Sequence, residues 1–161
     1  MTAIQQKTIG IVLFPEVEVL DFCGPFEVFS VTRLIEWIRQ RAKKVETVAS
    51  VCTGSLLLGQ AGLLDGRRAT THWVALSLLR ERFPKVNVVD DQHVVEEKNI
   101  LTSAGISAGI DLALRVVARY FGEEVARYTA RYMEYPYPES NARRVQVGAG
   151  VPGQPAAGGL G

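Results

Sequence analysis

The residue with the clearest potential for chemistry is Cys52, in the run Ser50-Val51-Cys52-Thr53-Gly54. Small residues two positions before and after the thiol, between a strand-like and a helix-like segment, match the spacing of a nucleophile elbow. In such a turn the thiol meets free N–H groups and the positive dipole end of the following helix, which favour the thiolate. Backbone N–H groups near Thr53 can also stabilise a developing anion. The spacing therefore predicts a catalytic nucleophile, with a buried and inert thiol as the alternative.

Two histidines are the other side chains suited to proton transfer or metal binding. His72 lies in the run ATTHW at the start of a predicted helix, where it either approaches the Cys52 pocket or makes a local hydrogen bond. His93 falls in a β-rich segment and is the weaker candidate. Because neither histidine has Cys or acidic residues at metal-ligand spacing, we expect no zinc site.

Composition and charge limit the class of protein. The chain has 161 residues, 47% hydrophobic and 22% charged, as expected for one soluble domain with a packed core. Eighteen Lys and Arg against 17 Asp and Glu give a net charge of +1, so we expect no nucleic-acid partner. Two cysteines and no secretory signal indicate a cytoplasmic protein with reduced thiols. No apolar run approaches the roughly 20 residues that span a bilayer, so we expect no membrane partner.

The first half of the chain predicts the elements that position Cys52. The apolar, β-branched run Thr8–Phe14 predicts a strand covered on both faces, as in a parallel sheet. A loop and a helix over about 26–44 lead to a second strand over 45–51. Cys52 follows in a tight turn, and the next helix covers about 55–64.

The middle of the chain predicts a helix and several short strands. Apolar spacing indicates a helix from His72 to Phe83, capped by Thr70 or Thr71. Three short β-rich segments between 86 and 103 indicate a small antiparallel addition to the sheet.

The last part predicts two helices and a tail. Apolar residues recur at helical spacing over 110–121, and Gly122 supplies a stop. A further helix over about 123–133 carries Arg127 on a solvated, charged face. The glycine-rich segment 148–161 predicts a flexible tail, so the folded domain is expected to cover 1–147.

Three runs of the sequence resemble the ThiJ/PfpI superfamily, which has a class I glutamine amidotransferase-like fold. They are IGIVLFPEVEVLDFCGPFEVF (9–29), SVCTGSLLLGQAGLLDGRRATTHW (50–73) and LTSAGISAGIDLAL (101–114). The resemblance extends over most of Thr8–Tyr137. It implies an α/β protein, a flavodoxin-like three-layer sandwich with a mostly parallel sheet, and it implies the self-association into dimers that is common in this superfamily.

Within this superfamily, Thr53 replaces the histidine that follows the nucleophile in the protease and deglycase-like branches. The combination of LDxxGP with CTGS is instead similar to isocyanide hydratases and to the sensor domains of AraC-type transcription regulators. In the hydratases the aspartate of LDxxGP lies near the thiol, which implies catalytic roles for Asp21 and Cys52, with Thr53 beside the nucleophile. Gly54, His72 and Cys23 are expected to line the substrate pocket, Cys23 because it follows Asp21 so closely.

The implied reaction is the hydration of an isocyanide, a small molecule, to an N-substituted formamide through a covalent thioimidate. Cys52 would be the nucleophile and Asp21 the general acid and then base, with no metal or organic cofactor. Two alternatives concern single residues, because Asp21 can instead cap the helix that starts near Gly24 and Cys23 can simply pack in the core.

The sequence departs from the family after Val31, where relatives have a block of additional strands and a loop rich in proline and glycine. The fold is therefore expected to be shortened by an internal deletion. Two other functions stay open: a ligand-sensing domain without catalysis, which the resemblance to AraC-type sensors implies, and an inactive remnant with an incomplete pocket, which the missing block implies.

Overall fold

The structure, a computed structural model, describes residues 34–145 and 147. Several predictions lie outside these residues: the strand Thr8–Phe14, the positions of Asp21 and Cys23, the deletion after Val31 and the tail 148–161. Of the predicted helix over 26–44, residues 34–42 are described and are helical. The described part is an α/β fold, as predicted.

A three-stranded mixed sheet, in the order β1-β5-β4, carries the site. Strand β1 (Val48–Ser50) pairs in parallel with β5 (Ile100–Ser103), with Val48 opposite Ile100. Strand β4 (Val94–Glu97) pairs with β5 in the antiparallel sense. The prediction of a small antiparallel addition over 86–103, within a mixed sheet, is therefore confirmed for the pairing of β4 with β5. It was wrong for the place of β5, which also pairs in parallel with β1 and is the central strand of this sheet.

Two short strands form a second, parallel pair. Strand β2 (Arg68–Ala69) lies beside β3 (Asn87–Val88). Between them the chain forms the 3₁₀ helix η1 (Trp73–Ala75) and the helix α3 (Leu76–Arg82). Helix α2 (Gly54–Gln60) is shorter than the predicted helix over 55–64.

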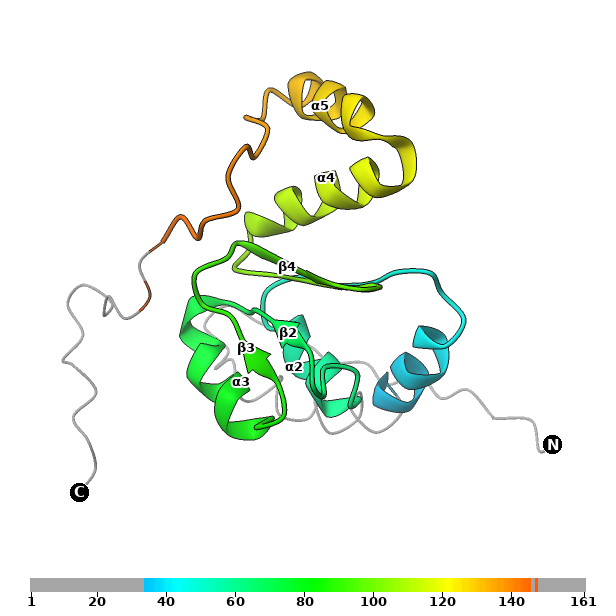
Figure 1. The fold of residues 1–161 in the computed structure, drawn as a ribbon, viewed down its shortest axis with the longest axis vertical. Helices are drawn as coiled ribbons and strands as arrows, with labels where there is room; N and C mark the ends of the chain where they lie inside the picture. Colours follow the sequence, from blue (N-terminus) through cyan, green and yellow to red (C-terminus); the bar gives the residue numbers. More distant parts are fainter. Residues whose placement is uncertain (1–33, 146, 148–161) are drawn as a thin grey trace, which may run out of the picture.

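Helices cover both faces of the sheet, as the three-layer prediction requires. Figure 1 shows α4 (Ala108–Phe121) and α5 (Glu123–Tyr132) on one side of β4, with α2, α3, β2 and β3 on the other. Successive β5 residues point to opposite faces. Ile100 packs with Leu58 of α2, whereas Leu101 packs with Leu112 of α4. Burying each such side chain contributes roughly 1.5–3 kcal/mol.

Helix α4 has the predicted extent at its C-terminal end but not the predicted buried face. Gly122 ends it with φ +93°, a conformation that glycine adopts without strain. Phe121, expected on the apolar face, is 70% exposed, whereas Asp111 is buried. The buried face therefore includes a polar residue, which apolar spacing alone does not predict.

Candidate active site

Cys52 lies in a strained turn between β1 and α2. Its backbone has φ +58°, a left-handed conformation that is uncommon for residues other than glycine. Three hydrogen bonds hold it there: its N–H donates to the carbonyl of Ala104 (3.1 Å), and its carbonyl accepts from the hydroxyls of Thr71 (3.0 Å) and Ser55 (3.4 Å). Such strain persists only where the surroundings over-determine the conformation. The predicted strand, sharp turn and helix are thus observed.

The small residues around the thiol have a steric reason. A Cβ atom added to Gly54 would lie 3.3 Å from the Cβ of Ser50, which is closer than ordinary contact. A Cβ atom added to Gly109, at the start of α4, would lie 3.1 Å from Cγ1 of Val51. The turn therefore packs against α4 with no room for larger side chains at these positions.

Cys52 and its neighbours remain partly accessible. The residue Cys52 is half-buried and Thr53 is exposed. Within the described residues, no acceptor pairs with the Thr53 N–H, which leaves that donor beside the thiol. The turn therefore combines a partly accessible cysteine with the backbone donor of Thr53, a pair that a small molecule could bind.

His72 caps the turn that follows β2. Its Nδ1 accepts a hydrogen bond from the backbone N–H of Val74 (3.4 Å). This nitrogen therefore makes the local hydrogen bond that is one of the two alternatives predicted for His72 from the sequence. The ring also lies against Gly105, where an added Cβ would come within 2.6 Å of its Cδ2. The structure therefore places His72 against the loop after β5 and next to Thr71, the residue that binds the Cys52 carbonyl.

Thr70 and Thr71 do not cap the helix as the sequence predicted. Both are fully buried and bind other parts of the chain. The Thr70 N–H donates to the Thr102 hydroxyl (2.9 Å), and the Thr71 hydroxyl donates to the Cys52 carbonyl. Tertiary hydrogen bonds have replaced the local ones that threonine can make before a helix.

Arg143 reaches this threonine pair from the C-terminal part of the described chain. Its Nη2 donates to the Thr70 hydroxyl (2.6 Å) and to the Thr71 carbonyl (3.1 Å). Burial lowers the pKa of the guanidinium, and the nearby charges of Asp90 and Asp91 oppose that shift. The sequence offers no local signal for this arrangement, because Arg143 lies more than 70 residues from its partners.

His93 belongs to a second buried group, centred on Asp111. The Asp111 carboxylate accepts from the Tyr135 hydroxyl (2.7 Å) and from Arg144 Nη2 (2.6 Å), and it lies 3.7 Å from Nε2 of His93. Burial lowers the pKa of His93, although the Asp111 charge acts in the opposite direction. This group connects α4, the start of β4 and the segment after α5.

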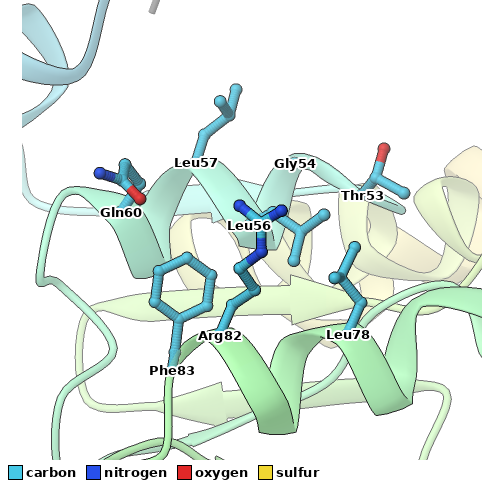
Figure 2. Close-up of a pocket in the computed structure, with 8 residues that line it drawn as sticks. All are labelled: Thr53, Gly54, Leu56, Leu57, Gln60, Leu78, Arg82 and Phe83. Carbon is cyan, nitrogen blue, oxygen red and sulfur yellow. The ribbon is translucent and has the colours of Figure 1, made fainter.

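A mainly apolar groove of about 660 Å³ starts at Thr53 and follows α2. Figure 2 shows Leu56 of α2 facing Leu78 and Arg82 of α3, with Leu57 pointing to the other side of the helix. Cys52 is absent from the residues that line this groove. We therefore place the candidate site at the turn itself and regard the groove as a space between two helices.

Two absences concern the described residues alone. Within 34–145 and 147, no three His, Cys, Asp or Glu side chains gather as a metal site would require. In the same residues, no helix has the length and apolar character needed to cross a membrane.

Of the predicted site residues, the structure brings Cys52, Thr53 and Gly54 into one turn. His72 directly follows Thr71, whose hydroxyl binds the Cys52 carbonyl in that turn. Asp21 and Cys23 lie outside the described part of the chain. The residues that sequence reasoning missed are Thr71 and Arg143.

Comparison with known proteins shows which family and which relatives this chain resembles. The profile of the DJ-1/PfpI family matches residues 25–119. An isonitrile hydratase of Pseudomonas putida is 42% identical over 102 residues, which are 63% of this chain and 43% of that protein. The HTH-type transcriptional regulator CdhR of Pseudomonas aeruginosa is 40% identical over 93 residues, 58% of this chain and 27% of the regulator.

A solved structure of a ThiJ/PfpI family protein from Pseudomonas syringae has a similar fold. It superposes with a TM-score of 0.58 at 35% identity, covering 66% of this chain and 43% of the other. The chain therefore spans less than half the length of these relatives.

Proposed function

This chain belongs to the DJ-1/PfpI family, and on that premise we propose that it is a cysteine-dependent hydro-lyase that hydrates an isocyanide to an N-substituted formamide. The observation that carries the proposal is the left-handed backbone of Cys52 in the turn before α2. The similarity to an isonitrile hydratase supports this choice of substrate.

In the proposed reaction the Cys52 thiolate attacks the terminal carbon of the isocyanide and forms a C–S bond. A proton delivered to the same carbon completes a thioimidate, R–N=CH–S–Cys52. Water then adds to this carbon, and collapse of the adduct breaks the C–S bond and returns the thiolate. The net change is the addition of one water molecule, so no oxidant, reductant or cofactor is needed.

Asp21 is proposed to supply the first proton and, once ionised, to activate the water. This role rests on its place in the LDxxGP motif of the family. Thr53 is proposed to act beside the nucleophile through its backbone N–H, and Gly54, His72 and Cys23 to line the substrate pocket. The folded unit is proposed to cover 1–147 and to form a homodimer.

The test is incubation with a simple alkyl isocyanide, with loss of the isocyanide and appearance of the formamide followed by chromatography. Cys52→Ala is expected to abolish turnover because no thioimidate can form. Asp21→Asn is expected to lower the rate by about 10² to 10⁴, the usual contribution of general acid–base catalysis. Full activity in a folded Asp21→Asn variant would exclude that role for Asp21.

A ligand-sensing function is the second candidate, because the regulator CdhR matches nearly as well as the hydratase. A sensor binds its ligand without consuming it. An isocyanide or other small molecule that raises the unfolding temperature but is recovered unchanged would favour this function over catalysis.

Light scattering over a wide concentration range tests the proposed homodimer. A monomer at every concentration would contradict it.

A further inference from the structure

Arg143 is connected to the Cys52 turn through one intermediate residue. Thr71 is held at two of its polar groups: its carbonyl accepts from Arg143 Nη2, and its hydroxyl donates to the Cys52 carbonyl. The same Nη2 atom binds the hydroxyl of Thr70, which precedes it. The guanidinium thus fixes the segment that holds the strained turn.

Stability does not account well for this arginine. Its Nε and Nη1 atoms are buried and have no hydrogen-bond partner among the described residues. Unpaired buried donors on a cation are costly, and this cost offsets part of what the two hydrogen bonds of Nη2 contribute. A costly group in contact with a candidate site needs a functional explanation.

We propose that Arg143 is a positioning residue for the Cys52 nucleophile, acting through Thr71 to hold the Cys52 carbonyl and the turn that presents the thiol. The effect on isocyanide turnover rests on the proposed function. The effect on thiol reactivity does not, because alkylation needs only the sulfur atom and its surroundings.

The proposal depends on how the strained backbone of Cys52 is held by its hydrogen bonds. A left-handed cysteine relaxes to an ordinary conformation unless its neighbours hold it. Of the two hydroxyls on the Cys52 carbonyl, Thr71 is the closer at 3.0 Å, and Ser55 lies at 3.4 Å. Without Arg143 the Thr71 carbonyl loses its tether, so the better of the two contacts weakens.

The test compares Arg143→Met with Arg143→Lys in the full chain. Iodoacetamide alkylation of Cys52, followed by residue-resolved mass spectrometry, is expected to be about tenfold slower in Arg143→Met, less than the 10²-fold that a misplaced catalytic group can cost. Arg143→Lys is expected to restore most of the rate. Because a single nitrogen, Nη2, makes both bonds, one ammonium can replace it.

The matched control is Arg144→Met. Arg144 is the next residue and also anchors the C-terminal segment, but it binds Asp111 and Tyr135 instead of the threonines. Its loss is expected to leave Cys52 alkylation unchanged. If Arg144→Met does not fold, Tyr135→Phe takes its place. Equal slowing in the control and in Arg143→Met would overturn the proposal, since Arg143 would then act only as a general anchor.

A double-mutant cycle tests the route through Thr71. If Arg143 acts through Thr71, Thr71→Val should slow alkylation, and adding Arg143→Met should slow it little further. Fully additive effects of the two substitutions would overturn this route. Unchanged alkylation of Cys52 in Thr71→Val would also overturn it, and this single variant gives the answer if Arg143→Met fails to fold. Unfolding temperatures are expected to stay within about 3 °C of the parent for Arg143→Met, a shift that corresponds to little change in stability.

The isocyanide assay on the same variants separates the two proposals. Slower alkylation in Arg143→Met with a parent that hydrates no isocyanide would support the positioning role and contradict the hydratase. Normal alkylation in Arg143→Met with an active parent would support the hydratase and contradict the positioning role.

Discussion

Replacing Cys52 with glycine and, separately, with alanine measures the backbone strain of the turn. Both variants lose the thiol, so their difference reports the backbone at φ +58° rather than sulfur contacts. Glycine occupies this region as readily as the right-handed one, whereas alanine does not. We therefore expect Cys52→Gly to be the more stable variant.

The magnitude follows from two opposing contributions. A residue with a Cβ pays roughly 1–2 kcal/mol in the left-handed conformation. Glycine, in turn, loses about 0.5–1 kcal/mol more than alanine through the entropy of the unfolded chain. With midpoints of about 1.5 and about 0.75 kcal/mol, the difference predicts that Cys52→Gly exceeds Cys52→Ala by about 0.75 kcal/mol in free energy of unfolding, opposite in sign to an ordinary position.

Urea denaturation of both variants in one buffer gives this difference. Gln60 supplies a matched control pair, because it is exposed and lies within helix α2 with an ordinary right-handed backbone. Gln60→Gly is expected to be less stable than Gln60→Ala. If Cys52→Ala proved as stable as Cys52→Gly or more so, the turn would not be strained and the elbow interpretation would lose its main support.

Three further predictions concern the buried groups around the site. The pKa of His93 is lowered by burial, so its stabilising contribution is complete above pH 6.5 and is lost as the pH falls toward its folded-state pKa. As the pH is lowered from 8 to 5, the free energy of unfolding from urea denaturation should therefore fall below pH 6.5 by up to about 1.4 kcal/mol per pH unit, and a His93→Gln variant with the same slope would contradict this. Gly59→Ala places a Cβ 2.7 Å from the Phe83 ring and should cost about 1–3 kcal/mol in thermal unfolding, so an unchanged midpoint would show that the ring moves freely. Asp111→Asn removes the carboxylate that binds Arg144 and should cost about 2 kcal/mol by urea denaturation, against which equal stability would count.

The candidate turn was predictable because its signals are local. Small residues at Ser50 and Gly54, an apolar strand before them and a helix after them define the elbow within about ten residues. The steric need for those small residues is visible in the 3.3 Å approach at Gly54. The shape of such a turn depends on residues close together in the chain, so their spacing in the sequence is enough to predict it.

The sheet order and the support behind the turn were not predictable because they depend on distant pairs. Strand β5 is central because Val48 pairs with Ile100, more than 50 residues away. Thr71 precedes a helix and looks like a cap, but its hydroxyl bonds to Cys52 instead. Arg143 has no pattern around it that would indicate its partners.

The same limit explains the error on the buried face of α4. Apolar periodicity favoured Phe121, yet that residue lies at the last turn and is mostly exposed. Asp111 is buried instead because Tyr135 and Arg144 complete its hydrogen bonds. A charged side chain can occupy a core position when distant partners satisfy it, and only the folded chain brings those partners together.

Two energetic costs meet at the Cys52 turn. One is the left-handed backbone of Cys52, and the other is the buried guanidinium of Arg143 with two unpaired nitrogens. A glycine would relieve the first cost, whereas only a joint replacement of the guanidinium and its buried partners would relieve the second. Their connection through Thr71 means that the second cost maintains the first. Sequences most often depart from locally favourable choices at functional sites. Two linked unfavourable features at one turn therefore agree with a thiol that is presented to a substrate, and not with a cysteine that only packs in the core.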